Sequence, residues 1–383
     1  ISIFMNKLSR RKFLFTLGAG LGAVGIHRLS FLNDKNNISN LSINNKRLII
    51  IHLQGGNDGL FTLAPRNNDT LYAHRRILMG EIHNGLDWGN DLVLNAKLKD
   101  FFDLAQKGWL SIIPNVGYPK PTGSHTVSER VWASGYIPGE KSATTGWIGR
   151  LIDENKLVIN DFKQTAIGFA GDRQLIYAGK INQGVNWIGN QNFESELKHM
   201  INNKSNRFKD HDVLFKELKY SYEQIQLLKD IEPYPGYPQT GLGNDLAIIN
   251  SIIRKNKPFK VFHLVHHGYD THQWQTHRLN QLYNDLGKCL YTFSHELNRI
   301  GEWNNTQVLI YSEFGRSIDE NSNGGTDHGT AGPVFVLGGE QIYESLVNLK
   351  PIYEIYSRYN TPILKYQVDF RDVYKTLINN WLT

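Results

Sequence analysis

Acidic and histidine side chains follow three apolar segments that lie far apart in the sequence. The segments are 48–53, 259–265 and 307–311, and each has the length and composition of a β-strand. Carboxylates and imidazoles without thiolates suit divalent cations such as Zn²⁺, Mn²⁺ or Ca²⁺. We therefore predict one metal or catalytic site from the side chains beyond these strands. They are Asp58, Asp270, His272, Glu313, Asp327 and His328.

A serine opens the predicted helix 124–134, which follows a further apolar strand and a loop with prolines and glycines. Serine is favoured at helix N-caps, so capping is the first interpretation of Ser124. The same place also allows catalysis, because backbone N–H groups and the helix dipole stabilise an anion there. Ser124 is thus a candidate catalytic hydroxyl, and His125 is a candidate acid, base or supporting residue. Arg316 or Arg130 could bind an anionic group with its guanidinium fork.

The elements that must position these residues alternate between apolar strands and helices, which predicts an α/β fold. We expect a doubly wound, mostly parallel sheet flanked by helices. In such sheets ligands bind beyond the carboxyl ends of the strands, so the acidic and histidine residues should share one crevice. The middle of the chain carries fewer signals. We interpret residues 46–383 as a single domain with a helical insertion near 190–243.

Charge and cysteine content exclude several classes of function. The 383-residue chain has a net charge of +6. Residues 1–30 hold five basic residues and no acidic one, so the rest of the chain has a net charge of +1. Without a basic surface we expect no nucleic-acid partner. The glycines after the first strand lack the GxGxxG spacing of a dinucleotide site. Cys289 is the only cysteine, which excludes an intramolecular disulfide and a thiolate metal cluster.

The N-terminal segment has the pattern of an export signal. Arg10 and Arg11 precede a moderately apolar, glycine-rich run, which is typical of a twin-arginine leader. The run is short and rich in glycine for a membrane span. We expect a leader and polar linker over residues 1–45, and a periplasmic or secreted protein that meets a membrane only through an uncleaved leader. The alternative is a basic N-terminal helix of a cytosolic protein.

Five motifs in order carry a resemblance to a known family. GGNDG, the Ser124–His125 pair, DTH, EFGR and GTDHGTAG resemble DUF1501, a family of bacterial exported proteins grouped with alkaline phosphatases and sulfatases. The resemblance covers nearly the whole chain from Lys46. It implies an alkaline-phosphatase-like fold, two adjacent divalent metals with Zn²⁺ the first choice, and a hydroxyl nucleophile at a helix start. It also implies roles for individual residues: Ser124 as nucleophile, and Asp58, Asp270, His272, Glu313, Asp327 and His328 as metal ligands.

Two departures from the superfamily pattern limit this resemblance. Thr126 and Ser128 stand where a formylglycine sulfatase needs Pro and Arg, so we do not expect formylglycine. Glu313 and Phe314 replace an Asp-His pair, which predicts that one metal site is weak or absent. We predict a metal-dependent hydrolase of phosphate or sulfate esters, acting on a small molecule or a polysaccharide. The alternative is a non-catalytic exported accessory or binding protein, which works with an exported protein partner.

Overall fold

The computed structural model describes residues 46–140, 143–157, 159, 165–169, 174–182, 184–187, 222, 226–347, 355–358 and 361–382. The predicted leader lies outside these residues, and so does most of the predicted helical insertion. Among the described residues, no helix combines the length and the apolar composition needed to cross a membrane.

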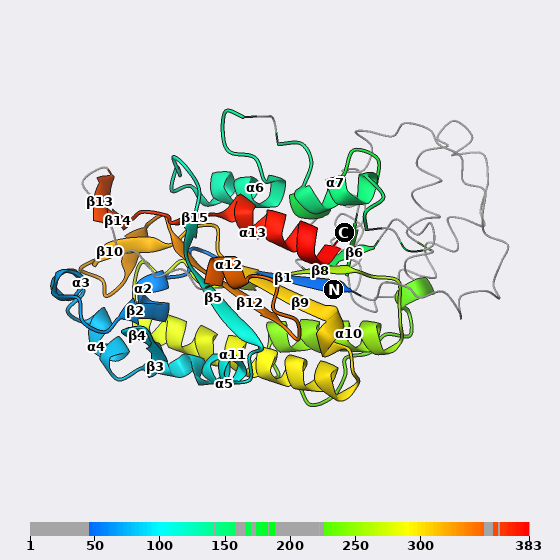
Figure 1. Ribbon diagram of the computed structural model, residues 1–383, viewed down its shortest axis with the longest axis horizontal. Helices are drawn as coiled ribbons and strands as arrows, with labels where there is room; N and C mark the ends of the chain where they lie inside the picture. Colours follow the sequence, from blue (N-terminus) through cyan, green and yellow to red (C-terminus); the bar gives the residue numbers. More distant parts are fainter. Residues whose placement is uncertain are drawn as a thin grey trace, which may run out of the picture.

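A sheet of eight strands forms the centre of the fold (Figure 1). β12 is antiparallel to both of its neighbours, while every other pairing in the sheet is parallel. The predicted doubly wound, mostly parallel sheet is therefore confirmed. From edge to edge the strands are β15 (Val368–Asp369), β5 (Leu110–Gly117), β12 (Gly332–Gly338), β9 (Thr306–Tyr311), β1 (Arg47–Gln54), β8 (Val261–His267), β6 (Ala166–Gly168) and β7 (Val185–Asn186).

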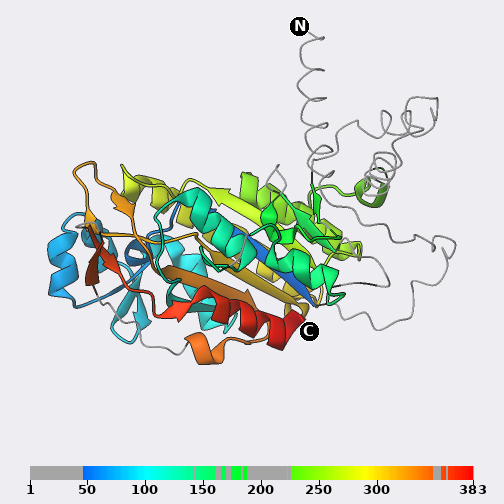
Figure 2. The same cartoon turned by 90° about the horizontal axis from the view of Figure 1, so that it is seen from above.

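Helices cover both faces of this sheet, as Figures 1 and 2 show. One face is covered by α5 (Lys99–Gln106), α10 (Gly241–Arg254) and α11 (Gln275–Arg299). The other is covered by α6 (His125–Ser134), α7 (Trp147–Asp153), α12 (Glu344–Val347) and α13 (Phe370–Leu377).

Alternation along β1 supplies both hydrophobic cores. Ile49 and Ile51 are fully buried in the cluster that includes α10 and α11, while Leu48 and Ile50 are fully buried in the cluster that includes α7 and α13. Successive side chains of a strand point to opposite faces, so a strand covered on both sides is apolar throughout. Each such side chain contributes about 1.5–3 kcal/mol through burial.

Smaller elements complete the fold. One small sheet has three strands, β2 (Leu63–Pro65), β4 (Leu92–Leu94) and β3 (Leu86–Gly89). Two further pairs of strands are antiparallel: β10 (Arg316–Glu320) pairs with β11 (Thr326–His328), and β13 (Ile355–Arg358) pairs with β14 (Thr361–Leu364). The short helices are α2 (Gly59–Thr62), α3 (Asp69–His74) and α4 (Leu78–His83), with 3₁₀ turns at Ala96–Leu98, Leu175–Tyr177 and Trp303–Asn305 and a π turn at Ile378–Leu382.

The strand register brings three predicted ligand loops to one edge. Gln54 at the end of β1 pairs with His267 at the end of β8, and His52 pairs with Tyr311 at the end of β9. Because the three strands are parallel, the loops that follow them leave the sheet side by side. This placement is the one that the sequence predicts.

Candidate metal centre

Three histidines from different parts of the chain converge beyond the carboxyl ends of these strands. His125 is the first residue of α6, His272 lies in the loop after β8, and His328 ends β11. Nε2 of His328 is 3.1 Å from Nε2 of His125 and 3.0 Å from Nε2 of His272. The imidazoles thus face one another through the same ring nitrogen.

The other nitrogen of each ring, Nδ1, lies against an acceptor. An ionised carboxylate and a carbonyl have no proton to give, so each Nδ1 carries the proton and donates. Each neutral ring then presents a bare lone pair at Nε2. Two bare lone pairs repel at these distances, whereas a cation between them would be bound by both. The acceptors are Glu313 at 2.6 Å from His125, Asp327 at 3.1 Å from His272 and the Gly123 carbonyl at 2.8 Å from His328.

Asp270 adds a carboxylate to the three nitrogens. Its Oδ1 lies 3.2 Å from Nε2 of His272 and 3.3 Å from Nε2 of His328, and its Oδ2 lies 3.7 Å from Nε2 of His125. Around a tetrahedral Zn²⁺ with bonds of about 2.0–2.1 Å, neighbouring ligand atoms are about 3.3 Å apart. His125, Asp270 and His328 have the spacing of a metal site, and His272 lies beside them. The donor set therefore fits a divalent ion.

Electrostatics keep the donors in states that suit a cation. Burial lowers the pKa of His328, and the charge of Arg316 lowers it further, so the ring is neutral at pH 7. Burial would raise the pKa of Asp270, but the hydrogen bond and charge of Arg316 outweigh burial and lower that pKa. The hydrogen bond from His125 to Glu313 raises the pKa of His125. Protons therefore compete with a metal chiefly at His125.

Glu313 orients histidines and does not offer a free ligand atom. The side chain is fully buried, and it accepts hydrogen bonds from His125, from Nε2 of His52 at 2.9 Å and from the amide of Gly55 at 2.8 Å. Burial would raise the pKa of Glu313, but the bonds from both histidines outweigh it and hold that pKa well below its usual range. Glu313, which the sequence predicts as a direct ligand, is thus an ionised carboxylate that accepts a hydrogen bond from His125. Carboxylates commonly orient metal-binding histidines in this way.

A second group of close ligand atoms is closed by internal hydrogen bonds. His52, Glu129 and Glu313 have metal-like spacing. However, His52 is bonded to Glu313, and Oε1 of Glu129 accepts from Nε2 of Gln54 at 2.7 Å. The resemblance implies two metal sites. The described part of the chain contains only one set of ligand atoms that is not closed by internal hydrogen bonds.

The structure corrects the predicted role of Asp58. This buried carboxylate caps α2 through the amides of Leu60 and Phe61, 3.1 and 3.2 Å from its Oδ1. Both oxygens also accept from Arg75, at 3.0 and 2.7 Å, and Oδ2 accepts from Gln275 at 2.5 Å. Five donated hydrogen bonds use the roughly four lone-pair sites of a carboxylate. Asp58 is a structural ion pair and leaves no lone pair for a metal.

Arg316 is also placed differently from the prediction. Its guanidinium is buried and donates a hydrogen bond to Asp270 at 2.5 Å. Arg316 therefore positions that carboxylate and is not exposed as a clamp for a bound anion. The remaining partners are backbone carbonyls of loops that converge at the site, those of Gly55, Gly56, Tyr269 and Thr326. The alternative clamp, Arg130, is exposed and donates to the carbonyl of Ala143.

Ser124 lies between two residues of the site. It is the N-cap of α6, yet its hydroxyl forms no capping hydrogen bond, and the residue is exposed. Its neighbours are His125 and Gly123, whose carbonyl holds His328. Ser124 therefore directly precedes one of the converging histidines, and its hydroxyl is not consumed by capping.

Sequence reasoning missed the support from β1. His52 and Gln54 both contact carboxylates of the second group, and His52 also stacks on Tyr311 with ring centroids 5.0 Å apart. Their signal is spacing: two polar residues at alternate positions near the end of an apolar strand share a face.

Fold and site together define a doubly wound α/β protein with a candidate metal centre of three histidines and an aspartate. The chain belongs to the family described as "Protein of unknown function (DUF1501)", whose model matches residues 110–342. The family identified from the sequence motifs is thereby confirmed. No curated protein shows a significant sequence match to the chain.

Several solved structures are similar to the chain at low identity. The lipoteichoic acid synthase LtaP from Listeria monocytogenes has 12% identity over 78% of this chain and 66% of its own, with a TM-score of 0.34. The alkaline phosphatase of the Antarctic bacterium TAB5 has 13% identity over 76% of this chain and 90% of its own, with a TM-score of 0.37. The C-terminal periplasmic domain of EcEptC from Escherichia coli, in complex with Zn, has 8% identity over 80% and 76%, with a TM-score of 0.34. These likenesses are distant.

Proposed function

We propose that this chain is a metal-dependent hydrolase of phosphate or sulfate esters with Ser124 as its nucleophile. One observation carries the proposal: Ser124, exposed and free of capping, directly precedes His125, whose Nε2 atom converges with those of His272 and His328. His125, His272, His328 and Asp270 would hold the ion, and a site rich in imidazole makes Zn²⁺ the first candidate.

The metal ligands, the start of α6 and Ser124 would each have a separate role in hydrolysis. A divalent ion at this place would neutralise the anionic oxygens of an ester and favour the ionised form of a hydroxyl. The amides and dipole at the start of the ten-residue helix α6 favour negative charge near Ser124. Arg316 fixes Asp270, and Glu313 fixes His125, so that the donors keep their positions. Ser124 displaces the alcohol from the phosphoryl or sulfuryl group, and water then releases the acid.

The proposal is tested by hydrolysis of p-nitrophenyl phosphate and p-nitrophenyl sulfate after loading with Zn²⁺, Mn²⁺ or Ca²⁺. Ser124→Ala should lower kcat by about 10²-fold or more, while metal content stays unchanged. Ser345→Ala changes an exposed serine of α12 and serves as the control. Turnover that is equal in the Ser124→Ala and wild-type proteins would remove Ser124 as nucleophile.

A binding or accessory function is the second candidate, and a specific observation favours it. Arg316 is occupied by backbone carbonyls and Asp270, and the second ligand group is closed. A member with these features could bind metal and an anionic partner without turnover. Bound metal together with no hydrolysis across phosphate and sulfate esters would support this function.

We also propose export through the twin-arginine leader, on the strength of Arg10 and Arg11 and the apolar run that follows. A reporter fused to residues 5–45 should reach the periplasm of a bacterium with a working twin-arginine system. An Arg10→Lys, Arg11→Lys variant should keep it in the cytoplasm. Cytoplasmic retention of the unmodified fusion would contradict export.

A further inference from the structure

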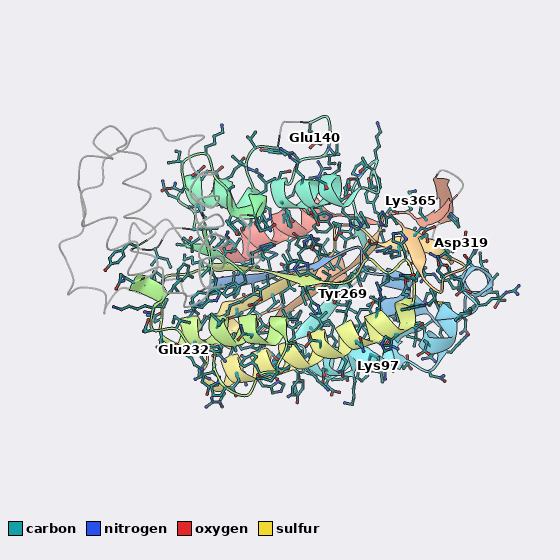
Figure 3. The ribbon with its side chains drawn as sticks, turned by 180° about the vertical axis from the view of Figure 1, so that it is seen from behind. Lys97, Glu140, Glu232, Tyr269, Asp319 and Lys365 are labelled. Carbon is teal, nitrogen blue, oxygen red and sulfur yellow. The ribbon has the colours of Figure 1, made fainter. Side chains whose placement is uncertain are left out.

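A surface cavity of about 800 Å³ lies beside the candidate metal centre and is used by none of the chemistry above. It is lined by the outer side of the first turns of α11, together with Ile77 before α4, Lys97 and Gly324. Lys97 is labelled in Figure 3, next to α11. Trp274 lines the cavity two residues after His272, so their Cα atoms are no more than about 7 Å apart.

Trp274 has an unusual conformation for its residue type. The side chain is 70% exposed, and the backbone is left-handed, with φ 53° and ψ 36°. That region costs a residue with a Cβ roughly 1–2 kcal/mol. Two backbone bonds hold it there, from Trp274 to the carbonyl of Asn323 at 3.2 Å and from Gln275 to the carbonyl of Gly324 at 3.0 Å. Strain that keeps a large aromatic ring at the surface indicates a binding role.

Amide side chains line the same cavity along α11. Asn284 follows Gln281 by three residues and Asn280 by four, so it neighbours both on the helix surface. Each amide offers both donors and an acceptor. The Oδ1 atom of Asn280 is buried and accepts no hydrogen bond within the described part of the chain. The lining contains no acidic residue and one lysine.

We propose that this cavity binds a sugar unit of a saccharide, neutral or anionic, and that the saccharide carries the ester presented to the metal centre. The flat ring of Trp274 matches the C–H face of a sugar, and the amides match hydroxyls, which both donate and accept. From His277 to Asn284 the helix rises about 10 Å, enough for two sugar units. The absence of acidic lining residues and the presence of Lys97 favour sulfated or phosphorylated sugars over cationic ligands. The link to the metal centre rests on the proposed hydrolase function, whereas the sugar site does not.

The test measures binding without turnover. Metal-free protein with Ser124→Ala is titrated by calorimetry with cellohexaose, laminarihexaose, chitohexaose and a sulfated galactan hexasaccharide, with AMP as a nucleotide probe. Trp274→Gly removes the ring at a position whose φ favours glycine, so this variant should be at least as stable as its parent. We expect it to bind a hexasaccharide at least about tenfold more weakly. Trp274→Phe should keep most of the affinity, and Ile181→Ala, which changes an exposed apolar residue outside the cavity, should keep all of it.

The outcomes separate the two proposals. Hexasaccharide binding that needs an aromatic residue at 274 supports the sugar site, even if the wild-type protein hydrolyses no ester. Hydrolysis of simple aryl esters with no hexasaccharide binding would overturn the sugar site and leave the hydrolase standing. Equal binding by the Trp274→Gly variant and its parent, or Trp274-dependent binding of AMP alone, would also overturn it.

Discussion

The carbonyl oxygen of Gly123 accepts a hydrogen bond from Nδ1 of His328, 2.8 Å away, although 205 positions separate the two residues in sequence. This bond fixes the tautomer of His328 and aims Nε2 at the other imidazoles. It also attaches β11 to the start of α6, where Ser124 follows Gly123. The candidate nucleophile and the candidate metal donors are thus positioned by one shared contact.

We predict that the purified protein binds about one equivalent of a divalent ion, because one ligand set is open and the other is closed by hydrogen bonds. Asp270→Asn and His328→Ala should each lose most of that metal, as measured by inductively coupled plasma mass spectrometry. His277→Ala removes an exposed histidine outside the cluster and is the matched control. Two equivalents in the wild type, or metal loss in the control, would contradict the assignment.

Glu313→Gln should weaken metal binding by about 10–100-fold, because a neutral amide orients His125 less firmly than a carboxylate does. Competition with a chromophoric chelator measures the affinity. Glu129→Gln changes a carboxylate of the closed group, and we expect it to have a much smaller effect. Equal losses in the two variants would show that Glu129 also supports the ion.

The sequence predicts the strands that carry the site because they are buried on both faces and hence largely apolar. β1, β8 and β9 are examples, and the loops beyond their ends leave the sheet side by side. The direction of β12 could not be predicted in this way. Its apolar run resembles those of the parallel strands, and its direction depends on connections elsewhere in the chain.

Sequence patterns distinguish carboxylates poorly because their roles depend on distant partners. Asp58 and Asp270 both follow apolar strands near glycines, yet Arg75 and Gln275 neutralise and satisfy Asp58, while Asp270 faces the imidazoles. Arg316 is likewise predicted from the sequence as a clamp for a phosphate or sulfate. In the structure its hydrogen bonds hold Asp270 and four backbone carbonyls. Such pairings are fixed by tertiary structure alone.

His263 should make the protein acid-sensitive. The ring is buried, its Nδ1 has no hydrogen-bond partner among the residues that the structure describes, and burial lowers the pKa of His263 to about 3. Below pH 6.5 the imidazole of His263 binds a proton in the unfolded chain but not in the folded protein, so stability falls as pH falls toward 3. His263→Leu should remove a loss of about 1.4 kcal/mol per pH unit in this window. Urea unfolding at pH 7 and pH 5 measures it, and a gain that is equal at both pH values would exclude His263 as the cause.

Asp245 should destabilise the protein in the opposite pH range. Burial raises the pKa of this α10 carboxyl to about 7, above its ordinary value of 3.8. The folded protein therefore holds a proton that the unfolded chain releases, and stability falls as pH rises from 4 to 7. Asp245→Asn keeps the shape of the protonated form, so it should leave stability unchanged at pH 4 and raise it by about 2–4 kcal/mol at pH 8. Thermal unfolding at the two pH values measures this difference.

Asp103→Asn, which alters a carboxylate paired with Lys99 at the surface, should show no such gain. A stabilisation of Asp245→Asn that is independent of pH would mean that the carboxylate is solvated in the folded protein.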